Sequence, residues 1–73
     1  MSWVRLDDQF PDHPKVIAAG PSASWLYISA LCYSNRMLTD GFIAAPVLRR
    51  LGNRAQAQRL VNAGLWEQAE GGW

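Results

Sequence analysis

The sequence predicts one small, mainly α-helical domain. The chain has 73 residues, of which 49% are hydrophobic and 18% are charged, a composition typical of a folded globular domain rather than a disordered one. Apolar residues recur at spacings of three and four, and glycines and prolines separate these segments. Four tryptophans, two tyrosines and two phenylalanines supply the large apolar groups that so short a chain needs for a core. Residues 1–73 are therefore expected to form a single domain.

The first part of the chain predicts an arm followed by two helices. Residues 1–10 contain "WVRLDD", apolar near its start and then charged, which suits an extended arm or a short strand. The segment 12–37 should hold the two helices. Asp12 is the expected N-cap of the first, which ends near Ala19 because Gly20-Pro21 follows.

The second helix, "SASWLYISALCYSNRML", has the strongest helical pattern in the chain. Ser22 is its expected cap. Apolar residues fall on nearly every side of it, which is typical of a buried central helix. We therefore expect Trp25, Tyr27, Cys32 and Tyr33 to lie in the core.

A turn and a second pair of helices follow. Thr39–Gly41 should form the turn, and Phe42–Ile43 suits a strand of two or three residues. The segment 46–63 then contains one helix entered through Pro46 and ended by Gly52, and another capped by Asn53. Two short helices joined by a glycine turn are typical of a helix-turn-helix.

The last residues, 65–73, predict part of a β-ribbon. Leu65 and Trp66 would open a strand, Glu70–Gly72 would make a tight turn, and Trp73 would begin the return strand. The whole order predicts a mainly α fold: a winged helix-turn-helix with a short or incomplete β-wing.

Charge distribution suggests what such a domain would bind. The stretch "LRRLGNRAQAQRLVNAGLWE" carries four arginines, and no acid occurs between Gly41 and Trp66. Duplex DNA is bound mainly through cationic side chains, and the second helix of a helix-turn-helix enters the major groove. Arg49 and Arg50 would contact phosphates, whereas side chains of the following helix would reach bases. The predicted DNA-binding residues are Arg49, Arg50, Asn53, Arg54, Gln58, Arg59 and Asn62. Arginine and glutamine also suit an ordinary solvated helix face, so this alternative stays open.

The pieces "WVRLDDQFPDHPKV", "LCYSNRMLTDGFI" and "LVNAGLWE...GGW" together resemble the amino-terminal winged-helix domain of phage and actinobacterial replication-initiator or replisome-organiser proteins, distantly similar to the DnaD-like amino-terminal domain. The resemblance covers Trp3 to Trp73. It implies a double-stranded-DNA-binding or assembly module in replication or transcription regulation, in a bacterium or a phage-infected host cell. It does not imply catalysis. A single cysteine, a charged amino-terminal stretch and the lack of an apolar run of about 20 residues predict a cytoplasmic protein.

Other chemistry finds little support in the sequence. His13 and Cys32 could in principle form a base and nucleophile, but no third orienting group is evident. One histidine and one cysteine do not supply a metal site, and Asp7, Asp8 and Asp12 suit a solvated edge better than an ion site. We expect no enzyme activity, no cofactor, no metal and no membrane partner.

A different class of function remains open. Tryptophans Trp3, Trp66 and Trp73 exceed what so small a core can enclose, and we expect Trp3 to pack near Trp66. Together with an unpaired edge at Leu65–Ala69, they would suit a protein-interaction module that forms a homodimer or docks a replication or host protein. A small DNA-bending protein is a third possibility.

Overall fold

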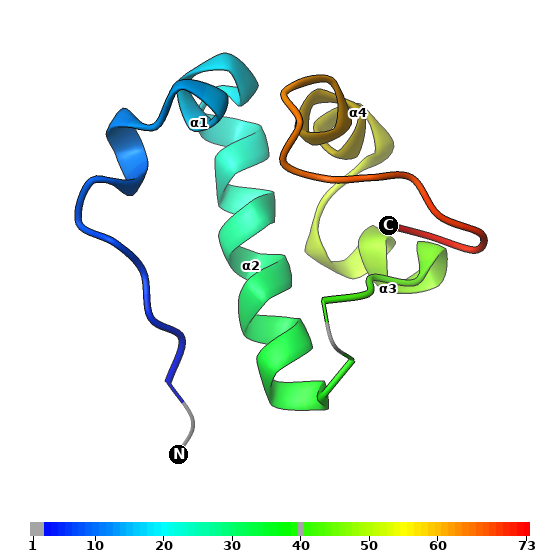
Figure 1. Ribbon diagram of the computed structural model, residues 1–73. Coiled ribbons are helices and arrows are strands. Elements are labelled where there is room, and N and C mark those ends of the chain that lie inside the picture. Colours follow the sequence, from blue (N-terminus) through cyan, green and yellow to red (C-terminus); the bar gives the residue numbers. More distant parts are fainter. Residues whose placement is uncertain (1–2, 40) are drawn as a thin grey trace.

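The computed structural model describes residues 3–39 and 41–73. It is mainly helical, as the sequence predicts. The helical segments are η1 (Phe10–Asp12), α1 (Pro14–Ala19), α2 (Pro21–Met37), α3 (Ala45–Leu51) and α4 (Arg54–Asn62) (Figure 1). Strand pairing within the described ranges is limited to two isolated antiparallel bridges, Ala44–Gly72 and Ala69–Gly72. In the same ranges, no helix combines the length and apolarity that crossing a bilayer requires.

Helix α2 is the central element, and α1, α3 and α4 all pack against it. The amino-terminal segment lies along one side of α2, and α3 with the carboxyl-terminal segment lies on the other (Figure 1). Burial of apolar area between these helices is the main stabilising contribution. The core consists of Ala19, Ala23, Leu26, Ala30, Ile43, Leu48, Ala57 and Leu60.

The prediction that α2 is buried on nearly every side is wrong. Its buried residues are confined to one face, Ala23, Leu26, Ala30 and Ser34. Trp25 is 66% exposed, and Cys32 is also exposed, so neither belongs to the core. Tyr27 and Tyr33 are half-buried against the core. Three short helices cannot cover a helix of 17 residues all round, which leaves an apolar side uncovered.

The starts of the first two helices also differ from the prediction. His13, not Asp12, caps α1, and its Nδ1 accepts a hydrogen bond from the Lys15 N–H at 3.1 Å. Helix α2 begins at Pro21 with Gly20 as its N-cap, so Ser22 lies inside the first turn. Proline is well suited to the first helical position, because its missing N–H has no partner there. In both helices the cap is therefore the residue before the proline.

Helix α2 ends in a left-handed residue that is not glycine. Leu38 has φ 56° and ψ 46°, and its N–H donates to the Ser34 carbonyl. The buried Ser34 hydroxyl accepts hydrogen bonds from Thr39 Oγ1 at 2.8 Å and from the Gly41 N–H at 2.6 Å. These bonds hold the turn that leads out of α2. Asp40, part of the predicted turn, lies outside the described residues.

Replacing Leu38 with glycine is expected to stabilise the protein by about 0.5–1 kcal/mol. Left-handed backbone costs a side-chain-bearing residue about 1–2 kcal/mol, and the greater flexibility of glycine in the unfolded chain offsets part of the gain. The Leu38 side chain is 86% exposed, so little packing is lost. Thermal and urea unfolding measure the change. Met37→Gly, one residue earlier and inside the helix, should instead destabilise; an equal effect of both changes would contradict this account.

The carboxyl-terminal residues form a tight turn that closes onto the start of α3. Ala69 and Gly72 exchange two backbone hydrogen bonds, at 2.8 and 3.2 Å, around Glu70-Gly71. Ile43 and Trp73 exchange two more, at 2.8 and 2.9 Å. The strand predicted to open at Leu65 and Trp66 is absent from this part of the structure. Both N–H groups donate to the Leu60 carbonyl instead, because free carbonyls at the end of α4 are available to them.

Candidate nucleic-acid interface

Helices α3 and α4 are joined by two residues, Gly52 and Asn53. Asn53 caps α4, as the sequence predicts, and its Oδ1 accepts the Gln56 N–H at 2.9 Å. Gln56 Oε1 in turn accepts the Asn53 N–H at 2.8 Å, which completes a capping box. The Asn53 oxygen is therefore occupied by the cap and is not a free DNA-binding group in this structure.

Gln56 also fixes α4 against α2. Its Nε2 donates to the Ser22 carbonyl at 3.1 Å and to the Ser22 hydroxyl at 2.7 Å. Gly52 makes room for this contact, because a Cβ there would collide with the Gln56 side chain and lie 3.0 Å from Leu26 Cδ1. The sequence reasoning missed Gln56, although an asparagine followed three residues later by glutamine is a capping-box signal.

The outer side of α4 is polar. Ala57 and Leu60 are buried toward α2, whereas Arg54, Ala55, Gln58, Arg59 and Asn62 are all exposed. Gln58 Nε2 donates to Asn62 Oδ1 at 2.9 Å, so these two amides form one unit along the exposed side. Because Ala55 is small, it leaves the first turn of this side open to close approach. We call Arg54, Ala55, Gln58 and Asn62 the α4 face.

The two arginines of α4 lie at opposite edges of the helix. At about 100° per residue, positions 54 and 59 are about 140° apart. The Arg54 guanidinium carbon is 5.9 Å from the centroid of the Trp73 ring. Arg59 Nη1 donates to the Ala19 carbonyl at 3.3 Å and lies over Gly20. Arg59 therefore contacts the end of α1 through one guanidinium nitrogen, although the residue is exposed, as expected of the solvent side of this helix.

Arg49 and Arg50, both exposed, lie in the last turn of α3. The Arg50 guanidinium carbon is 6.0 Å from the Tyr33 ring centroid, and that of Arg36 on α2 is also 6.0 Å away. Arg36 is not among the residues predicted from the sequence. The acid-poor segment is longer than 41–66, because Asp40 is the only acid between Asp12 and Glu67, and this longer segment includes Arg36. The guanidinium groups are thus not aligned along one helix. Those of Arg36 and Arg50 lie near Tyr33, that of Arg54 lies near Trp73, and that of Arg59 contacts the end of α1.

The tryptophans do not form the predicted partner surface. Trp66 and Trp73 are half-buried, pack against the core, and have ring centroids 6.2 Å apart. Trp3 is 81% exposed, but its segment lies across α2 from the carboxyl-terminal segment (Figure 1). The predicted contact between Trp3 and Trp66 is therefore wrong. Trp3 instead lines a shallow pocket beside Leu31 and Leu38 of α2 and the turn after it.

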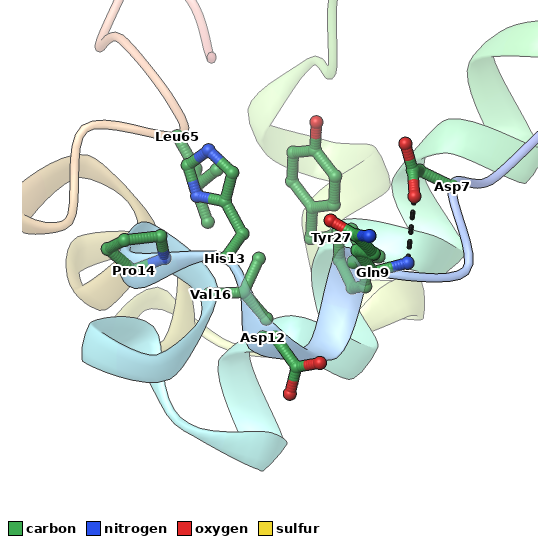
Figure 2. Close-up of a pocket in the computed structure, with 9 residues that line it drawn as sticks. Asp7, Gln9, Asp12, His13, Pro14, Val16, Tyr27 and Leu65 are labelled. Atoms are coloured by element: carbon green, nitrogen blue, oxygen red, sulfur yellow. Dashed lines mark hydrogen bonds between the residues drawn. The ribbon is translucent and has the colours of Figure 1, made fainter.

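A second pocket, of about 420 Å³, lies between η1, α1 and α2. Tyr27 stacks on Phe10 there with ring centroids 5.6 Å apart, and the His13 ring lies beside Leu65 (Figure 2). Asp7 Oδ1 accepts a hydrogen bond from the Gln9 N–H at 2.8 Å (Figure 2). The Asp12 carboxylate points away from the other labelled side chains (Figure 2). The polar groups here serve local turns and caps and do not converge on one point.

Comparison of the chain with models of protein families, with curated proteins and with solved structures gave no match.

Proposed function

We propose that the chain is a winged-helix domain that binds duplex DNA, with α4 as the helix that enters the major groove. In this proposal α3, Gly52-Asn53 and α4 form the helix-turn-helix. Ala69–Trp73 and Ile43-Ala44 form a short wing. The observation that carries the proposal is the α4 face, exposed and polar on a helix fixed to the core by Gln56 and Leu60. A role for this domain at a phage or bacterial replication origin rests on the sequence resemblance alone.

Charge around this face supports DNA as the ligand. No acidic residue occurs from Gly41 to Trp66, so both helices of the proposed motif lack groups that would repel phosphate. Arg54 stands at the start of α4 and Arg49 at the end of α3, where each can accompany a phosphate or a guanine edge. Arg50 adds a guanidinium group beside Tyr33. Glu70, at the tip of the turn, makes the wing the weaker contact.

The amide pair on the α4 face suggests what it would read. The bond between Gln58 and Asn62 uses the Gln58 nitrogen and the Asn62 oxygen. The remaining polar atoms of the two amides, Gln58 Oε1 and Asn62 Nδ2, are an acceptor and a donor. The major-groove edge of adenine offers the matching donor and acceptor. We therefore infer a preference for an A·T pair opposite these residues.

Arg54→Ala is expected to weaken binding to a fluorescein-labelled duplex by about 1–3 kcal/mol, roughly 5- to 150-fold. Fluorescence anisotropy at low salt measures it, and affinity of the unmodified protein should fall steeply as salt is raised. Arg5→Ala is the matched control, because it removes the same charge from the amino-terminal arm on the far side of α2. Equal losses from both variants, or none from Arg54→Ala, would contradict α4 as the DNA-binding helix.

A protein-interaction module remains the alternative function. The surface first predicted for it is not available in this structure, because Trp66 and Trp73 pack against the core. Exposed apolar side chains do occur elsewhere, on the arm, α1 and α2. Absence of DNA affinity together with self-association that is insensitive to salt would favour this alternative.

A further inference from the structure

An uncovered apolar surface lies between the arm, α1 and α2. Leu6, Ile17 and Trp25 are 47%, 65% and 66% exposed, and with Ile28 they line a groove of about 540 Å³. Cys32, also exposed, continues this surface because it lies seven residues, close to two helical turns, beyond Trp25. We call Leu6, Ile17, Trp25, Ile28 and Cys32 the arm–α2 face. Contiguous exposed apolar groups of this kind are typical of an interaction site.

Charges are divided between the two ends of this face. Asp7, Asp8 and Asp12 are exposed on the arm and η1. Asp7 and Asp12 line a pocket with Tyr27, which lies in the first half of α2. Arg36 lies in the last turn of α2. Arg5 lines a pocket with Asn35 and Leu38 at the same end. Near the start of α2 the three carboxylates outnumber the cations Lys15 and Arg59, which contact the Gly64 and Ala19 carbonyls. The surface is therefore net acidic near the start of α2, apolar in the middle and basic near its end.

We propose that a second copy of this chain docks on the arm–α2 face. A two-fold axis near Ile28 would set the α2 helices of the two copies antiparallel. Trp25 of each copy would then face Cys32 of the other, as a self-complementary two-fold interface requires. The same operation places Arg36 of each copy near the acidic arm of the other. In a parallel arrangement the acidic arms of the two copies would face each other, and so would the two Arg36 side chains. The charge distribution therefore favours the antiparallel arrangement. It also favours a second copy as the occupant, because each end of the surface is complementary to the other end.

The dimer would leave the α4 face accessible. Figure 1 shows the amino-terminal segment on one side of α2 and α3 with the carboxyl-terminal segment on the other. The 17 residues of α2 extend for about 25 Å, so the two antiparallel helices can contact each other over several turns. The proposal does not depend on DNA binding, and its test is made without DNA.

Sedimentation velocity of the full chain over a concentration series is the first test. We expect a reversible monomer–dimer equilibrium, and Trp25→Ser should raise its dissociation constant by about tenfold or more. Phe42→Ser is the matched control, since Phe42 is 40% exposed but lies outside the face. A monomer at every concentration overturns the proposal, and so does a dimer that Trp25→Ser leaves unchanged.

Charge reversal tests the arrangement of the two copies. Arg36→Glu should weaken the dimer, because the new carboxylate faces the acidic arm of the second copy. Adding Asp8→Arg and Asp12→Arg to the same chain should restore the lost affinity. A nitroxide on Cys32 of one copy should also broaden the Trp25 indole signal of a ¹⁵N-labelled second copy. A dimer with no rescue and no broadening would use another surface and would overturn the antiparallel arrangement.

Discussion

Replacing Leu60 with alanine is expected to lower the free energy of unfolding by about 2–5 kcal/mol. Leu60 has no exposed surface and joins α4 to the core beside Leu26 and Ala57. Truncation removes buried methyl groups and leaves a cavity that the fixed start of α4 prevents from closing. Domains of this size have only a few kcal/mol of stability in total, so the variant should be largely unfolded at 37 °C. Urea unfolding followed by circular dichroism measures the loss.

Two further variants keep this prediction testable if Leu60→Ala does not fold. Leu60→Met conserves volume and should cost less than about 1.5 kcal/mol. Met37→Ala removes a side chain of similar size that is 55% exposed, and its effect should be within about 0.5 kcal/mol. A small loss from Leu60→Ala, similar to that of Met37→Ala, would mean that α4 does not pack on α2 through Leu60.

Replacing Gly72 with alanine is expected to detach the carboxyl-terminal turn. A Cβ at Gly72 would lie 2.9 Å from Ala44 Cα and would also collide with the Ile43 carbonyl oxygen. These are backbone atoms that cannot rotate away, so the Ala44–Gly72 pairing must open. We expect the free energy of unfolding to fall by about 2–4 kcal/mol, because of overpacking and because the hydrogen bonds between Ile43 and Trp73 break. Hydrogen exchange at the Ile43 and Trp73 amides should accelerate strongly.

Gly71→Asn is the control for this change. Gly71 has φ +81°, and a Cβ there meets nothing within 4 Å. Asparagine tolerates left-handed backbone better than most residues, so this variant should keep the turn. Unchanged amide protection in Gly72→Ala, or equal loss in both variants, would show that close backbone approach at Gly72 does not hold the turn to α3.

Local signals in the sequence predicted the helices well. Gly20-Pro21, Pro46, Gly52 and Asn53 all mark helix boundaries in the structure, because each acts through its own backbone geometry or its nearest neighbours. The tight turn at Glu70-Gly71 was predicted for the same reason. The coarse, mainly helical fold therefore follows from short-range physical chemistry.

Burial and side-chain partners were harder to predict, because they depend on which elements meet. The periodicity of α2 showed apolar residues on several sides, but only the packing of α1, α3 and α4 decides which side is covered. Trp25 is exposed for this reason. The sequence places Arg59 on the solvent side of α4, where it would reach DNA, and does not predict its contact with α1. Arg59 contacts the Ala19 carbonyl because α1 ends beside it, and no spacing along the chain indicates that neighbour.

Both ends of the Gln56 amide are engaged, the oxygen with the N–H of Asn53 and the nitrogen with Ser22. The orientation of α4 is therefore established when the domain folds. Any ligand of this helix meets a surface whose conformational entropy has already been lost, so ordering the backbone takes little from the free energy of association. Affinity at α4 should then depend chiefly on the match between its side chains and the ligand.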